Sequence, residues 1–264
     1  MPIKRIVSFG CSLIYGDELT GWDPGDNKGS YLRDRPNPGV WTQQLANMYD
    51  VPHINKGFSG ASNEFIYRQL MRYLFYKKLP NYEWSHHSIP NLDVGYEDGD
   101  FIIVQWTSFA RNEIYNQDRE YVPGKNFDHY VQLQAGFIEN EIPDDRNVYR
   151  KILTWDDDNS AAERMLNKLI ATQAMTLTIT DQFMQCFGLS EPVYKDELLD
   201  ARMELEGNKH VFEEFGHFLK FAYLLKLPFG KGNHPLEAAH AEYAGLVAKH
   251  IEEQFKLLRP QQTV

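Results

Sequence analysis

The order of apolar runs and helical patterns predicts an α/β fold in which a mostly parallel sheet is covered by helices. Residues 101–106, FIIVQW, form a continuous apolar run, which is typical of a parallel strand buried on both faces. Two shorter runs, at residues 3–9 and 51–55, precede it and are expected to be strands as well. Helical patterns separate these runs, and this alternation of strands with helices favours a layered fold.

The expected helices are marked by periodicity and by capping residues. In residues 41–49, Trp41, Leu45 and Met48 recur at the spacing of one helical face. The other helices are expected after a cap at Ser62 or Asn63, from the capping box Ser160–Glu163, over residues 209–226, and from Pro235 to residue 255. Residues 16–40 are rich in Gly, Pro, Asp and Asn and predict a long loop of the kind that is functional or disordered.

The 264 residues are expected to form one domain, because no internal repeat and no linker divides the chain. The formal net charge of −10 argues against a general nucleic-acid-binding protein, which needs a basic face to neutralise phosphates. No apolar run is long enough to cross a bilayer, and the first strand is too short for a signal sequence. We therefore expect a cytoplasmic protein that does not bind membranes.

Two cysteines, Cys11 and Cys186, make neither a disulfide framework nor a zinc site with four cysteine ligands. We expect them to be free thiols. Asp156, Asp157 and Asp158 are interpreted as solvated acids before a helix, and His86 and His87 have no further ligands nearby in sequence. The sequence therefore predicts no metal site and no cofactor.

Residues suited to acyl transfer are expected at one edge of the sheet. The first strand ends in Gly10 and Cys11, directly before Ser12, while His234 stands in a glycine-containing loop directly before Pro235. In doubly wound α/β sheets, ligands bind at the carboxyl ends of the strands. Gly60 follows the second predicted strand, and Thr107 and Ser108 follow the third. A hydroxyl, a base and several hydrogen-bond donors would thus converge, as nucleophilic catalysis requires.

Four blocks of the sequence resemble the SGNH (GDSL-like) hydrolases: FGCSLIYG, NKGFSGASN, QWTSFARNE and GNHPLEAAHAEYA. The first block is most similar to the subgroup that has Gly-Cys-Ser in place of Gly-Asp-Ser. The resemblance covers about the first 115 and the last 40 residues. It implies a single three-layer α/β/α domain over residues 1–264, flavodoxin-like in architecture, with a divergent helical insertion around residues 115–210.

The resemblance also implies roles for individual residues. Ser12 would be the nucleophile and His234 the base. The backbone N–H groups of Ser12 and Gly60 would line the oxyanion hole, with a side-chain donor from Thr107 or Ser108. The family's Gly-x-Asn-Asp block is absent from this chain, and WTSFARNE stands in its place. Asn112, which follows within the same block, is a weaker candidate for the side-chain donor. Cys11 is expected to pack beneath the site rather than to react.

A second departure concerns the acid of the catalytic triad. The family has an Asp three residues before the His, but this chain has Lys231 there. Either Ser12 and His234 work as a dyad, with a backbone carbonyl or water orienting the ring, or a carboxylate comes from elsewhere. We expect the carbonyl or water, so that an Asp placed at position 231 should raise the rate.

The sequence thus predicts a serine esterase. Acetyl groups on a carbohydrate are the first candidate substrate, because the loop at residues 16–40 is polar and aromatic. A lipase would instead be expected to have longer apolar loops near its site. The alternative is a non-catalytic binding or structural module on the same fold, since a fold alone does not fix a function.

Overall fold

The structure is a computed structural model of the 264-residue chain. It describes residues 2–16, 18–19, 39–58, 60–75, 94–108, 112–115, 130–133, 158–189, 208–212, 214, 216–257 and 259.

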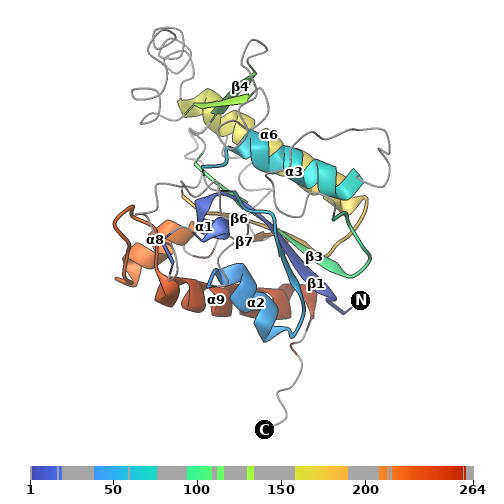
Figure 1. The fold of residues 1–264 in the computed structure, drawn as a ribbon. Helices are drawn as coiled ribbons and strands as arrows, with labels where there is room; N and C mark the ends of the chain where they lie inside the picture. Colours follow the sequence, from blue (N-terminus) through green and yellow to red (C-terminus); the bar gives the residue numbers. More distant parts are fainter. Residues whose placement is uncertain are drawn as a thin grey trace.

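A parallel five-stranded sheet forms the centre of the protein (Figure 1). Its strands are β1 (Arg5–Phe9), β2 (His53–Asn55), β3 (Asp100–Trp106), β6 (Phe183–Phe187) and β7 (Val211–Phe212), in the spatial order β2-β1-β3-β6-β7. Every pair in this sheet is parallel. All seven residues of β3 are buried, as the continuous apolar run predicted. The α/β fold class with a parallel sheet is therefore confirmed.

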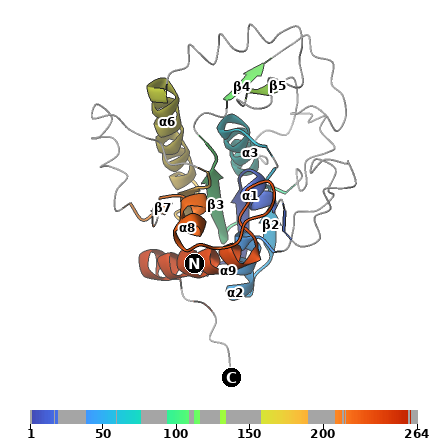
Figure 2. The same cartoon turned by 90° about the vertical axis from the view of Figure 1, so that its left-hand side faces the viewer.

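Helices cover both faces of the sheet (Figures 1 and 2). On one face lie α2 (Trp41–Met48) and α9 (Glu237–Phe255), which pack against each other. On the other face lie α3 (Asn63–Phe75) and α6 (Asp158–Leu177). The short helices α1 (Ser12–Tyr15) and α8 (Phe218–Leu224) lie near the carboxyl ends of the strands. The strands β4 (Asn112–Tyr115) and β5 (Tyr130–Leu133) form a separate antiparallel pair.

Several boundaries differ from those predicted. Residues 209–226 are not one helix, because Val211 and Phe212 pair with β6 as β7 and only α8 is helical. The last helix begins at Glu237, with Leu236 as its extended N-cap, rather than at Pro235. Helix α6 begins at Asp158, two residues before the expected cap at Ser160. Within the range 115–210, β6 is a strand of the central sheet and α6 covers that sheet.

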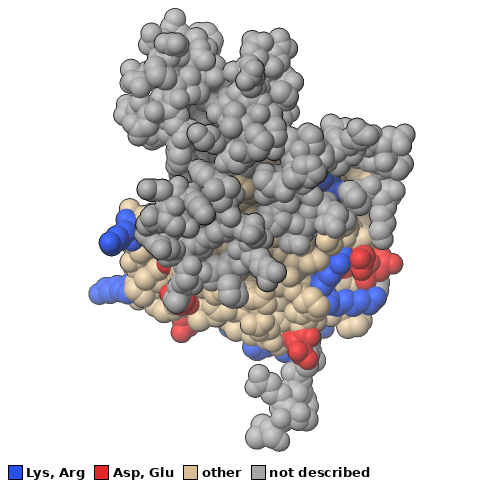
Figure 3. All heavy atoms as spheres, viewed as in Figure 1, with Lys and Arg blue, Asp and Glu red and all other residues tan. Residues whose placement is uncertain are grey.

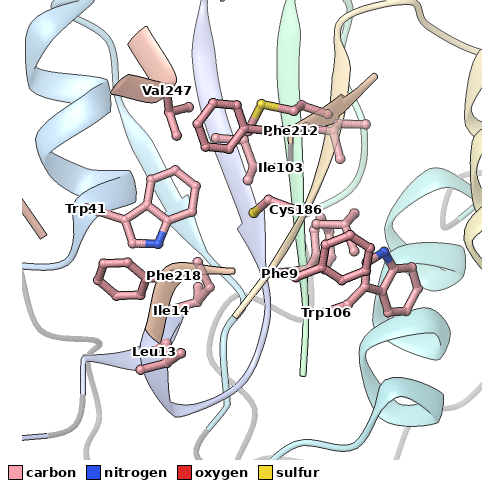
Figure 4. Close-up of a cluster of buried hydrophobic side chains, with 14 of the residues drawn as sticks. Phe9, Leu13, Ile14, Trp41, Ile103, Trp106, Cys186, Phe212, Phe218 and Val247 are labelled. Atoms are coloured by element: carbon pink, nitrogen blue, oxygen red, sulfur yellow. The ribbon is translucent and has the colours of Figure 1, made fainter. Parts of the chain in front are cut away.

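The core lies on both sides of β1 and β3 (Figure 4). Phe9 and Trp106 pack on the side of α3, and Trp41 and Phe218 pack on the opposite side. Side chains of α1 belong to this second cluster, which includes Leu13 and Ile14. The first turn after β1 is consequently anchored by apolar burial rather than exposed on a free loop.

In the part of the surface that the described residues form, Lys and Arg side chains share the visible face with Asp and Glu (Figure 3). Among the described helices, none has both the length and the apolar character that a membrane span requires.

Candidate functional site

The turn that presents Ser12 is shaped by Gly10. A Cβ on Gly10 would lie 2.4 Å from Cγ1 of Ile14 and 3.2 Å from the carbonyl oxygen of Gln105, so no larger residue fits without a shift of the chain. The carbonyl of Cys11 then accepts the N–H of Ile14 at 3.0 Å and opens helix α1. Ser12 is the first residue of this helix. Gly10, directly after β1, therefore lets the chain turn closely past Ile14 and β3.

Cys11 and Ser12 are both buried, but their side chains have different neighbours. The Cys11 side chain is fully buried, whereas Ser12 retains 4% exposure and its hydroxyl faces a histidine. The thiol lies 3.9 Å from the Ser12 Oγ. This arrangement agrees with the expectation that Cys11 packs beneath the turn.

The register of the sheet brings three loops to the same edge. Ser8 of β1 stands opposite Asn55 at the end of β2, and Phe9 stands opposite Val104 near the end of β3. Beyond β2, the N–H of Phe58 donates to the carbonyl of Gly10 at 2.9 Å. The segments leading to Gly60 and to Thr107 therefore emerge beside the turn that holds Ser12.

Asn63 fixes the chain after β3. Its side-chain oxygen accepts the N–H of Thr107 at 2.9 Å, and its amide group donates to the carbonyl of Ser108 at 3.1 Å. The Thr107 hydroxyl is buried and has no hydrogen-bond partner among the described residues. Gly60 has φ = +75°, a conformation that suits glycine.

His234 is held in reach of Ser12 by a tight turn before α9. The segments on either side of this turn pair through Phe229 and Pro235, and the N–H of Gly230 donates to the carbonyl of His234 at 2.9 Å. The Nε2 atom of His234 lies 2.9 Å from the Ser12 Oγ, although the two residues are 222 positions apart. The expected pairing of hydroxyl and imidazole is therefore present in the structure.

The second ring nitrogen meets a carboxylate, which is the alternative to the expected carbonyl or water, and the sequence did not indicate that Glu18 supplies it. The Nδ1 atom of His234 lies 3.1 Å from Oε2 of Glu18, rather than next to a backbone carbonyl or water. Burial raises the pKa of the Glu18 carboxyl, but hydrogen bonds from the Gly232 and His234 N–H groups and from the ring outweigh this effect and lower the pKa overall. Glu18 thus remains an anion at neutral pH. Lys231 is exposed.

His240, one helical turn after the start of α9, ties this region to α2. Its Nδ1 accepts the backbone N–H of Trp41 at 3.0 Å. Burial lowers the pKa of His240 to about 3, so the ring stays neutral and keeps this acceptor. The bond holds the first residue of α2 against α9.

Among the described residues, no group of three or more His, Cys, Asp or Glu side chains is arranged to hold a metal ion. His86, His87, Asp156 and Asp157 lie outside the described residues.

No protein-family model matches this sequence, and no curated protein matches it. Among solved structures, the chain is similar to a member of the lipolytic protein G-D-S-L family from Veillonella parvula, with a TM-score of 0.42 and 13% identity over 97% of this chain and 100% of that one. It is also similar to an acetyl xylan esterase from the rumen bacterium Butyrivibrio proteoclasticus, with a TM-score of 0.46 and 11% identity over 97% of this chain and 65% of that one. At such identities the function has to be argued from the site itself.

Proposed function

We propose that this protein is a serine esterase in which Ser12 is the nucleophile and His234 is the general base. The distance of 2.9 Å between Ser12 Oγ and His234 Nε2 carries this proposal, because it is the contact through which a hydroxyl loses its proton as it attacks. The resemblance of the four sequence blocks to SGNH hydrolases supports it. An ester is the substrate class, because the site offers a nucleophile and a base and because no metal is needed for this chemistry.

The reaction would proceed in two steps. Ser12 Oγ attacks the ester carbonyl carbon while its proton passes to His234 Nε2, and the carbonyl electrons move to the oxygen. The tetrahedral intermediate collapses as the imidazolium returns the proton to the leaving alcohol, which leaves an acyl group on Ser12. Water then attacks the acyl carbon while the same imidazole takes its proton. As the bond from the acyl carbon to Ser12 Oγ breaks, the imidazolium returns that proton to Oγ, which releases the acid and restores the free serine.

The backbone N–H groups of Ser12 and Gly60, with a hydroxyl from Thr107 or Ser108, are proposed as the oxyanion hole. The Thr107 hydroxyl supports this assignment, because it is buried with no partner among the residues that the structure describes, and a buried donor left unpaired costs stability. Gly60 and Thr107 lie on segments that leave the same edge of the sheet as Ser12.

Replacement of Thr107 by valine is the test of that hydroxyl. Valine has nearly the same shape, and removal of an unsatisfied hydroxyl should leave the melting temperature unchanged or raise it. If Thr107 donates to the oxyanion, kcat should nevertheless fall by about 10²-fold. Unchanged kcat in Thr107→Val together with a loss in Ser108→Ala would move the role to Ser108.

Acetyl groups on a carbohydrate are proposed as the substrate. Most of the long loop at residues 16–40 that suggested this class lies outside the described residues, namely residues 17 and 20–38. A described feature supports it: Tyr223 is 56% exposed and stacks on Phe229, with ring centroids 4.4 Å apart. Phe229 pairs with Pro235, the residue after His234. An exposed aromatic ring of this kind suits the apolar face of a sugar ring.

Tyr223→Ala should raise KM for an acetylated oligosaccharide by about three- to tenfold, because one ring-stacking surface is lost. KM for p-nitrophenyl acetate should not change, since that substrate has no sugar to stack. Leu224→Ala is the matched control, because Leu224 is 59% exposed on the same helix. Equal KM values for the oligosaccharide in both variants would exclude Tyr223 from substrate binding.

The alternative function is a non-catalytic binding or structural module. The altered third block and the low exposure of Ser12 favour it. A fluorophosphonate probe separates the two, because it reacts covalently only with a serine that a base activates. Labelling mapped to Ser12, together with ester turnover, supports the esterase. No labelling and no turnover of any ester would favour the non-catalytic module.

A further inference from the structure

Glu18 is placed beside the base by an unusual local conformation. It lies six residues after Ser12, beyond the end of α1, and its φ is +65°. This left-handed conformation costs energy for a residue other than glycine and persists only where surrounding contacts fix it. The Glu18 side chain is only 6% exposed. A buried carboxylate in a strained segment requires hydrogen bonds that offset the free-energy cost of removing it from water.

The partners that the structure describes for the Glu18 carboxylate come from the turn that carries His234. Oε2 of Glu18 accepts the backbone N–H of His234 at 3.1 Å and lies 3.1 Å from the ring Nδ1. Oε1 accepts the backbone N–H of Gly232. Three donors from a single turn thus converge on one carboxylate.

The turn itself is shaped to receive this carboxylate. A Cβ on Gly230 would lie 2.8 Å from the Glu18 carboxyl carbon, and a Cβ on Gly232 would lie 2.9 Å from Oε2. Asn233 adopts φ = +62°, and its N–H closes the turn on the carbonyl of Gly230 at 3.1 Å. The two glycines leave room for the acid, and any side chain at either position would displace it.

We infer that Glu18 is the acid that positions His234 for its reaction with Ser12. It would replace the Asp that the family has at the position of Lys231. This inference rests on the proposed esterase function. With the anion at Nδ1, the ring carries its proton there and keeps the Nε2 lone pair toward the Ser12 hydroxyl. When Ser12 gives its proton to Nε2, the Glu18 carboxylate stabilises the resulting imidazolium without accepting a proton itself.

The position of Glu18 changes the expectation for Lys231. An Asp at position 231 was expected to raise the rate on the premise that Nδ1 lacks an acid. Nδ1 already has one. Lys231→Asp should therefore leave kcat within about twofold of wild type, and a tenfold gain would overturn the inference.

Glu18→Gln is the central variant, because it keeps the shape of the side chain and removes its charge. We expect kcat for p-nitrophenyl acetate to fall by about 10³- to 10⁴-fold, with KM within a few-fold of wild type. The rate of fluorophosphonate labelling of Ser12 should fall in parallel. Glu18→Asp, which keeps the charge on a shorter stem, should recover part of kcat.

Glu242→Gln is the matched control, because Glu242 is an acid of α9 whose side chain is exposed to solvent. It should leave kcat and the pH profile near wild type. A Glu18→Gln variant that melts like wild type and keeps its activity within threefold would overturn the role of Glu18.

A measurement without turnover separates failure of this inference from failure of the proposed function. The Nδ1–H proton of His234, hydrogen-bonded to a carboxylate, should give a ¹H resonance well downfield of the amide region, and Glu18→Gln should abolish it. If no ester is hydrolysed while the resonance is present and lost in the variant, the geometry stands and the esterase function fails. If esters are hydrolysed and the resonance survives in Glu18→Gln, the function stands and the assignment of Glu18 fails.

Discussion

Replacement of Ser12 by alanine should lower kcat for a short p-nitrophenyl ester by about 10⁶-fold, to the level that binding alone supports. The substitution removes the oxygen that faces His234 Nε2 and with it the acyl-enzyme route. Ser12 is nearly buried and begins α1, whose Leu13 and Ile14 are anchored in the core. The alanine variant should therefore fold normally, and a melting curve by circular dichroism checks this.

Cys11→Ala is the control for Ser12, the proposed nucleophile next to it in the sequence. Cys11 is fully buried, whereas the Ser12 hydroxyl lies 2.9 Å from His234 Nε2, so we expect the hydroxyl rather than the thiol to react. The variant should keep most of the activity and should still be labelled at Ser12 by a fluorophosphonate. If a folded Cys11→Ala protein is inactive while Ser12→Ala retains turnover, the nucleophile has been assigned to the wrong side chain.

The fold could be predicted where the sequence carries a strong pattern. The continuous apolar run of β3, the cap before α3 and the period of α2 are local signals, and the structure has these elements at the expected places. Ser62 indeed caps α3, accepting the N–H of Phe65 at 3.0 Å. Such elements are recognisable because propensity and burial pattern agree.

Strands β6 and β7 could not be predicted in this way. Strand β7 has only two residues, and its conformation depends on pairing with β6 rather than on its own sequence. In β6, the polar Gln185 interrupts the apolar run, yet it is fully buried because its side chain bonds Trp106 Nε1 and the carbonyl of Leu169. Tertiary contacts therefore overrode the local signal.

The serine and the histidine were predictable, but the acid was not. Both Ser12 and His234 stand at an element boundary with glycine nearby, which is visible in the sequence. Glu18 is 216 positions away from His234, whose ring it contacts, and no motif in the sequence around Glu18 indicates this contact. The one available signal was the pair of glycines at positions 230 and 232, which indicates that something approaches the turn closely.

Replacement of His234 by alanine should reduce kcat about as far as loss of the serine, by roughly 10⁶-fold, because the hydroxyl and the base act as one unit. The variant keeps Ser12 but leaves its proton without an acceptor at 2.9 Å. Labelling by a fluorophosphonate should slow in proportion. The substitution also takes a ring donor from Glu18, but the N–H groups of Gly232 and residue 234 remain to hold that carboxylate.

Imidazole added to His234→Ala tests whether the lost group is a base rather than a support for the fold. The deleted ring leaves space between Ser12 and Glu18, so free imidazole should restore part of the activity in a saturable manner. His234→Gln fills most of that space with a side chain that cannot act as a base, and it should respond less to imidazole. Absence of rescue in a folded alanine variant would argue against general base catalysis.

The pH dependence provides the final check on His234. The wild-type rate should rise with pH as the imidazolium loses its proton, since only the neutral ring can accept the proton of Ser12. The pKa of Glu18 is lowered, so its carboxylate stays charged across this range and does not add a second step to the rising limb. In His234→Ala with imidazole, the rising limb should instead follow the titration of free imidazole. A rising limb that is identical in wild type and in the unrescued variant would show that another group supplies the base.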